Sequence, residues 1–179
     1  MKIFHTKRGF TLIETLVAIT ILLLSIVGPM SIGATGIKST AYARDQITAF
    51  YIGQEGVELI RSIRDDNALN ARPWNSNIDA SCANASGCGI DVNTMVFRDC
   101  AVSTNCNIYY EPNGQLPNNT QRGFYQHTAT AQPTIYNRSI KISQDGLNPS
   151  EYTIDVTVTW LNQGVPKTLV VRSRMFDLY

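Results

Sequence analysis

A long apolar segment near the start of the chain dominates its hydrophobic pattern. A short leader ends at Gly9, and a predominantly apolar run of 28 residues extends from Phe10 to Ile37. At a rise of about 1.5 Å per residue, a helix of this length crosses a hydrocarbon layer of about 30 Å. Glu14 is the only charged residue in the run. A carboxylate inside a membrane-length segment indicates a functional role.

Beyond this run the pattern becomes amphipathic, which predicts that the helix continues over residues 38–66. Apolar residues recur there at spacings of three or four, with an interruption at Gly53 and Gln54. We expect the helix to end near Asp66, because Pro73 makes further continuation unfavourable. The predicted apolar stripe consists of Ala43, Ile47, Phe50, Val57 and Ile60.

Gly28 and Pro29 stand in the middle of the apolar run and predict a local irregularity in the helix. Proline lacks a backbone N–H and clashes with the preceding helical turn, so the helix is expected to kink or unwind at this point. The sequence leaves both forms of irregularity open.

The last third of the chain alternates apolar and polar residues with a period of two, which is typical of half-buried antiparallel strands. Three or four such strands have one apolar face that needs a cover, and the amphipathic half of the helix can provide it. The pattern therefore predicts an α+β fold, with a long N-terminal helix packed on a 3–4-stranded antiparallel sheet. The predicted strands are 135–143, 151–161 and 167–176, with shorter ones at 94–98, 107–110 and 123–126, and a turn at 162–164.

Four cysteines lie in the irregular stretch between helix and sheet, in two pairs of C-x5-C spacing: Cys82 with Cys88, and Cys100 with Cys106. Four cysteines allow three connectivities. Local pairing would close two small loops, while a crossed pattern or one that joins Cys88 to Cys100 remains open. Zinc ligands are usually spaced two to four residues apart, so disulfides are favoured and no metal is expected.

The charge of the chain gives little support for nucleic-acid binding. The leader contains three of the 15 Lys and Arg residues and no acidic residue, so the remainder has 12 basic against 14 acidic side chains. Such a near-neutral body lacks the basic surface that non-specific nucleic-acid binding requires.

Candidate catalytic chemistry is sparse. His5 and His127 lie far apart in the sequence, and we find no Ser/His/Asp or metal-ligating pattern, so we expect neither an enzyme nor a cofactor. Asp145, Asn148 and Glu151 are candidate calcium ligands in one loop. A plain turn explains the same residues more simply.

The charges around the apolar run predict its orientation. Lys2, Lys7 and Arg8 precede the run, and the next basic residue is Lys38. The positive-inside rule then places the leader in the cytoplasm and the rest of the chain outside. A cleaved secretory signal would have an apolar core of about 7–15 residues, shorter than this run. A permanent single-helix anchor explains the length but neither the glycine nor Glu14.

The octapeptide Lys-Arg-Gly-Phe-Thr-Leu-Ile-Glu at residues 7–14 resembles the class III signal of type IV pilins and pseudopilins. In that family, prepilin peptidase cleaves after the glycine and methylates the new terminal phenylalanine. The resemblance implies cleavage between Gly9 and Phe10 and N-methylation of Phe10. It gives Glu14 an assembly role, in which the carboxylate pairs with the terminal amine of its own or a neighbouring subunit. It also implies the type IV pilin fold.

The same resemblance implies a domain organisation and a set of partners. The leader peptide is 1–9, the long helix is 10–66 with its membrane-spanning part at 10–37, and an extracytoplasmic globular domain covers 67–179. The implied partners are prepilin peptidase, the N-terminal helices of other pilin subunits, the pilus assembly platform and the cytoplasmic membrane. The protein would be a single-pass membrane protein before assembly and part of an extracellular or periplasmic filament afterwards.

Residues 53–65 additionally resemble the corresponding helix of PilV-type minor pilins, which favours a minor rather than a major pilin. A pseudopilin of a type II secretion or competence system carries the same N-terminal motif and remains an alternative. An alternative of another class is a membrane-anchored surface binding or adhesion domain whose ligand site lies in residues 74–120.

Overall fold

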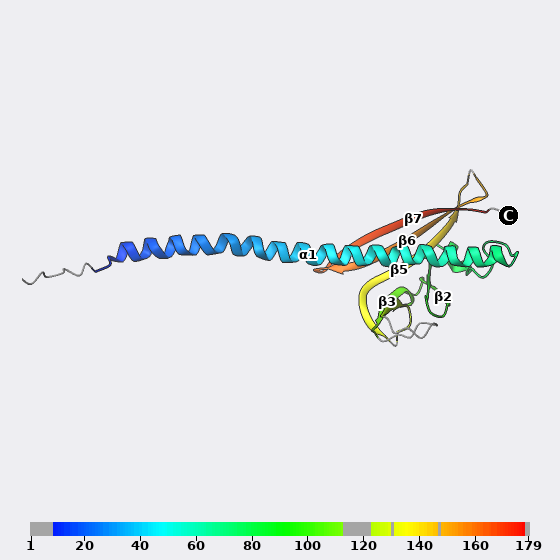
Figure 1. Ribbon diagram of the computed structural model, residues 1–179, viewed down its shortest axis with the longest axis horizontal. Coiled ribbons are helices and arrows are strands. Elements are labelled where there is room, and N and C mark those ends of the chain that lie inside the picture. Colours follow the sequence, from blue (N-terminus) through cyan, green and yellow to red (C-terminus); the bar gives the residue numbers. More distant parts are fainter. Residues whose placement is uncertain (1–8, 113–122, 130, 147, 178–179) are drawn as a thin grey trace, which may run out of the picture. The chain divides into compact units, whose positions relative to one another are not determined.

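The computed structural model describes residues 9–112, 123–129, 131–146 and 148–177, so the leader before Gly9 lies outside the described residues. The chain divides into two units, residues 1–44 and 45–179, which we treat separately. Helix α1, Leu12–Leu69, contributes to both units (Figure 1). In the first unit every described residue up to Ala41 is exposed.

The second unit is built on three long antiparallel strands: β5 (Gln132–Gln144), β6 (Glu151–Asn162) and β7 (Val165–Phe176). β6 is the middle one, because it pairs with β5 on one side and with β7 on the other. The turn between β6 and β7 consists of Gln163 and Gly164, both with positive φ, as a type I′ hairpin turn requires. These observations confirm the predicted α+β fold of a long helix on an antiparallel sheet.

Four short strands extend the sheet beyond the three or four strands that we expected. β1 (Cys88–Ile90) and β3 (Asn107–Glu111) both pair with the free edge of β5, at different points along its length. β2 (Phe97–Asp99) pairs with β1, and β4 (Phe124–Gln126) pairs with β3. Three of these short strands overlap the predicted ones at 94–98, 107–110 and 123–126. β1 was not predicted, because its three residues are all buried and show no alternation of apolar and polar positions.

Two short 3-10 helices complete the described part of this region: η1 (Ala80–Ala83) and η2 (Ser103–Cys106). Asp79 caps η1, since its side chain accepts a hydrogen bond from the backbone N–H of Ser81 at 2.8 Å.

The core of the second unit lies between the sheet and the last third of α1 (Figure 1). The predicted stripe on this helix is only partly correct: Val57 and Ile60 are buried, but Ala43, Ile47 and Phe50 are exposed. The buried face is rotated from the predicted one, and it contains Gly53, which belongs to the interruption in the predicted stripe, and also Gly56. Its members are Ala49, Ile52, Gly53, Gly56, Val57, Leu59, Ile60, Ile63 and Asn67.

Gly53 and Gly56 allow the helix to approach the sheet closely. A Cβ atom at Gly53 would lie 2.7 Å from Cγ2 of Val171, and one at Gly56 would lie 2.9 Å from Cγ1 of Val156. Both distances are shorter than a van der Waals contact, so neither position has room for a side chain without movement of the sheet.

Helix α1 ends at Leu69, slightly later than the predicted end near Asp66. Ala71 has a positive φ of 49°, and the N–H of Arg72 donates to the carbonyl of Asn67 at 2.9 Å. This is a Schellman-type ending with alanine in the left-handed position that glycine usually occupies. The absence of a glycine at this point made the end hard to place from sequence.

Candidate functional site

The predicted cleavage site precedes the helix. Gly9, Phe10 and Thr11 are exposed and non-helical, and α1 begins at Leu12. No heavy atom lies within 4 Å of a Cβ built on Gly9. Crowding therefore does not require a glycine here. A requirement from outside the fold, such as a narrow protease subsite, would explain it.

Thr11 and Glu14 form the start of the helix. The N–H of Glu14 donates to the side-chain oxygen of Thr11 at 3.3 Å, and the carbonyl of Thr11 accepts from the N–H of Glu14 and of Thr15. The sequence Thr-x-x-Glu has the form of a capping box, and an acid in the first turn also interacts favourably with the helix dipole. The sequence analysis did not recognise this local role for Glu14.

No part of the chain that the structure describes covers the apolar half of α1. It is long and apolar enough to span a membrane, and none of its most apolar stretch is buried. Phe10 is 76% exposed and Leu12 83%. An apolar surface of this extent requires either lipid or protein partners. The other large apolar residues exposed here are Ile13, Leu16, Val17, Ile19, Ile21, Leu22, Leu23, Leu24, Ile26, Val27, Met30, Ile32 and Ile37.

Five hydroxyl groups in residues 15–40 of the helix are satisfied locally. Each of the five donates to a backbone carbonyl three or four residues earlier, at 2.8–3.0 Å. Such bonds remove the need for water, which suits a segment surrounded by hydrocarbon. The residues concerned are Thr15, Thr20, Ser25, Thr35 and Thr40.

Gly28 and Pro29 lie within one continuous helix, with Pro29 inside α1. Pro29 cannot donate to the carbonyl of Ser25, so this turn lacks one backbone hydrogen bond. The kink that we expect at Gly28 and Pro29 stays a prediction.

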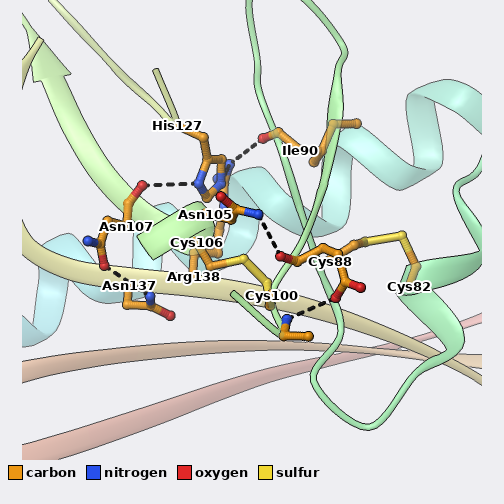
Figure 2. Close-up of a disulfide and its surroundings, with 12 residues drawn as sticks. Cys82, Cys88, Ile90, Cys100, Asn105, Cys106, Asn107, His127, Asn137 and Arg138 are labelled. Carbon is orange, nitrogen blue, oxygen red and sulfur yellow. Dashed lines mark hydrogen bonds between the residues drawn. A yellow bond between two sulfur atoms is a disulfide. The ribbon is translucent and has the colours of Figure 1, made fainter. Parts of the chain in front are cut away.

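The cysteines pair locally: Cys82 with Cys88, and Cys100 with Cys106 (Figure 2). The N–H of Cys100 also donates to the carbonyl of Gly87 at 3.1 Å, which joins the two disulfide loops. Cys82, Cys88 and Cys106 are buried. The disulfides thus hold the region between helix and sheet, where regular structure is short.

A buried arginine connects the helix to this region, and the sequence analysis missed it. Arg138 on β5 is fully buried, and its guanidinium donates to the carboxylate of Glu55 at 2.8 Å and to the carbonyl of Ile52 at 3.2 Å. It also donates to the carbonyl of Ile90 at 2.9 Å (Figure 2). One signal was visible: Arg138 has the same parity as Tyr136 and the other inward residues of its strand.

His127 lies against the same guanidinium (Figure 2). Its Nδ1 is 3.1 Å from the carbonyl of Asn107, and its Nε2 is 3.4 Å from a guanidinium nitrogen of Arg138. A carbonyl only accepts and an arginine only donates, so the neutral ring carries its proton on Nδ1. Burial, and then the charge of Arg138, lower the pKa of His127 to about 4.

Asp91 is a buried acidic residue near His127. Burial opposes its ionisation, but hydrogen bonds from the Thr128 hydroxyl and from the N–H groups of Asn93 and Thr94 outweigh burial and lower its pKa. His127 stands alone in the sequence, but in the folded protein it lies close to other ionisable side chains. No group of His, Cys, Asp and Glu side chains arranged to hold a metal occurs among the described residues.

Glu151, one of the candidate calcium ligands, is engaged by a protein cation. Its carboxylate accepts from Arg174 at 2.9 Å. The neighbouring pair on the same two strands joins Arg172 to Asp155 at 2.6 Å. These pairs neutralise the charges on the outer face of β6 and β7.

These features define the class of the protein. An exposed apolar half-helix follows a Gly-Phe junction, and the amphipathic half of the same helix packs on an antiparallel sheet stapled by disulfides. This is the architecture of a membrane-anchored, pilin-like protein.

Comparison with known proteins gives the family. Residues 5–28 match the family model of the prokaryotic N-terminal methylation motif. With the fold, this match supports the type IV pilin and pseudopilin family, whose proteins are structural rather than enzymatic. No curated protein and no solved structure matches the chain significantly.

Proposed function

We propose that this chain is a structural subunit, specifically a minor pilin, of a type IV pilus-like filament. Prepilin peptidase removes the leader 1–9 and methylates Phe10. The mature subunit waits in the cytoplasmic membrane with its N-terminus at the cytoplasmic side. The assembly platform then moves it into an extracellular or periplasm-spanning filament, where the globular part, residues 67–179, forms the surface.

One observation carries the proposal: the apolar half of α1 is exposed over its whole length and begins within the methylation motif, which covers residues 5–28. Lipid can cover this surface before assembly, and the same half-helices of other subunits can cover it in a filament. Both environments exclude water, so the exchange between them retains the burial of apolar area. The self-satisfied hydroxyls along this segment fit either environment.

The minor-pilin assignment rests on the resemblance of residues 53–65 to PilV-type minor pilins. The two glycines of that segment, Gly53 and Gly56, are the residues that bring the helix against the sheet. The close approach of helix and sheet therefore explains the two glycines of this segment. The abundance of the subunit in isolated filaments tests the assignment, because a minor pilin should be present at far less than one copy per major subunit.

Substitution of Gly9 by alanine tests the processing step. We expect Gly9→Ala to block cleavage, so that the uncut chain accumulates in the membrane and is missing from filaments. Immunoblotting of membrane and sheared-filament fractions measures both quantities, and mass spectrometry of the N-terminus detects the methylated Phe10. Gly36→Ala is a matched control for the cleavage step, since a Cβ atom at Gly36 would also have no heavy atom within 4 Å. A normally cleaved and assembled Gly9→Ala protein would contradict the proposal.

A further inference from the structure

Two hollows in the second unit flank a pair of aromatic side chains that the proposed filament role does not explain. The rings of Trp74 and Tyr152 lie 4.3 Å apart between centroids, at 52° to each other. Both residues are part-buried. A hollow of about 290 Å³ lies on one side and a hollow of about 590 Å³ on the other, and Trp74, Asn75 and Tyr152 line both.

The loop that carries Trp74 is held in place by a buried side chain. Asn67 is fully buried at the end of α1, and its amide donates to the carbonyl of Trp74 at 2.9 Å and to that of Ser76. The N–H of Ser76 closes a turn onto the carbonyl of Pro73 at 2.9 Å. The backbone at Trp74 is therefore held in place before any ligand arrives, which reduces the entropy lost on binding.

The rest of the smaller hollow is walled mainly by apolar side chains, together with two polar side chains and a disulfide. Asp79 and Gln144 line it, as does Cys82, which is bonded to Cys88. Gln144 is oriented by a hydrogen bond from its amide to the carbonyl of Pro149 at 2.6 Å. Aromatic rings next to amide and carboxylate groups offer both apolar faces and fixed hydrogen-bonding groups.

The charges around the hollows argue against anionic ligands. Arg72 lines the larger hollow, but it is engaged by Asp66 at 3.0 Å. Asp79 and Asp177 add two carboxylates to the linings. A phosphate or nucleic acid would meet net negative charge here, and a lipid tail would desolvate polar groups without replacing their hydrogen bonds.

We propose that the paired hollows around Trp74 and Tyr152 bind a neutral oligosaccharide. The C–H faces of sugar rings pack on the aromatic faces, and their hydroxyls bond to the planar polar side chains of Asn75, Gln144 and Asp79. The volumes suit more than one ring, so the ligand spans the aromatic pair. This proposal does not depend on filament assembly, because every residue in it belongs to the second unit.

Isothermal titration calorimetry of the full mature chain tests the proposal. The protein is kept in a zwitterionic detergent, since a detergent with a sugar head group would compete for the site. The probes are cellotriose, maltotriose and tri-N-acetylglucosamine. We expect saturable binding of at least one probe, weakened roughly 10-fold or more in Trp74→Ala, as is typical when a central aromatic contact is removed.

Two variants and two further probes make the outcome decisive. Trp74→Phe keeps an aromatic face and should retain most of the affinity, while Tyr51→Ala removes an exposed aromatic residue that lies outside both hollows and should change nothing. The near-ultraviolet signal of the buried Trp160 reports whether each variant is folded. The proposal is overturned if the wild type binds none of the three sugars, or if folded Trp74→Ala binds them equally. Binding of duplex DNA or a proline-rich peptide in place of the sugars would also overturn it.

Discussion

At the scale of single residues, we expect Arg138 to contribute more to the stability of the second unit than any surface charge. One guanidinium contacts the helix through Ile52 and Glu55 and the disulfide-stapled region through Ile90. These contacts compensate the cost of burying the charge of Arg138. Removal of either Arg138 or Glu55 therefore leaves the other charge without its partner.

We expect Arg138→Ala to lower the free energy of unfolding by about 3–5 kcal/mol, because Glu55 and two carbonyls lose their donor in a buried site. Guanidinium denaturation of the mature chain in detergent measures this value. Arg172→Ala is the matched control on the neighbouring face: its partner is Asp155, but Arg172 is mostly exposed. That variant should lose less than about 1 kcal/mol. Equal effects of the two substitutions would show that burial of Arg138 is unimportant.

His127 predicts how stability depends on pH. Its pKa is about 4 in the folded protein and ordinarily about 6.5, so the unfolded chain binds more protons between these values. The contribution of His127 to the free energy of unfolding should be fully present above pH 6.5. The free energy of unfolding should then fall by roughly 3 kcal/mol as the pH decreases towards 4. Denaturation curves at several pH values measure the slope. In His127→Gln the slope should largely disappear over this window, and an unchanged slope would refute the assignment.

At the scale of elements, the contact between α1 and the sheet depends on the absence of side chains. Gly56 faces Val156 in the middle of the sheet, whereas Gly53 faces Val171 on the edge strand β7. An edge strand has fewer neighbours and can yield more easily, so the two glycines should differ in their tolerance of substitution.

Gly56→Ala should therefore destabilise the second unit by about 1–3 kcal/mol, despite the better helix propensity of alanine, because the added methyl group overpacks the core. Gly53→Ala should cost less. Thermal unfolding followed by circular dichroism compares both variants with the wild type. A more stable Gly56→Ala protein would mean that helix and sheet can separate freely, contrary to the packing seen here.

At the scale of the whole molecule, Glu14 has two candidate roles. Its N–H bonds to Thr11 in an arrangement typical of a capping box, in which glutamine can replace glutamate. In a filament, its carboxylate would instead neutralise a terminal amine, and this role needs the negative charge.

We expect Glu14→Gln and Glu14→Ala to be processed normally but to enter filaments equally poorly, because both lack the charge that pairs with the amine of Phe10. Quantitative immunoblotting of sheared filaments against whole cells measures incorporation. Thr11→Ala, which removes the cap but keeps the charge, serves as the control and should assemble far better. Wild-type incorporation of Glu14→Gln would leave only the capping role.

Local sequence patterns were sufficient to predict much of the fold and the N-terminal site. The Gly-Phe junction, the apolar run and the alternation of 151–161 are each contained in a short window, so the sequence predicted the long helix, β6 and the turn at Gln163 and Gly164. The methylation motif is likewise contiguous, and its match over residues 5–28 requires no tertiary contact.

Tertiary structure decided the features that depend on residues far apart in the chain. The burial of Arg138 beside Glu55 and His127 and the position of β1 at the edge of β5 result from contacts that no local window contains. Sequence patterns were also insufficient for the buried glycines of α1. A glycine interrupts an apolar stripe in the sequence, and its role in packing is clear only when the opposing strand is known. Sequence alone thus predicted the processing site and the membrane anchor, because those signals are linear. The packing of the globular part was decided only by which distant surfaces meet.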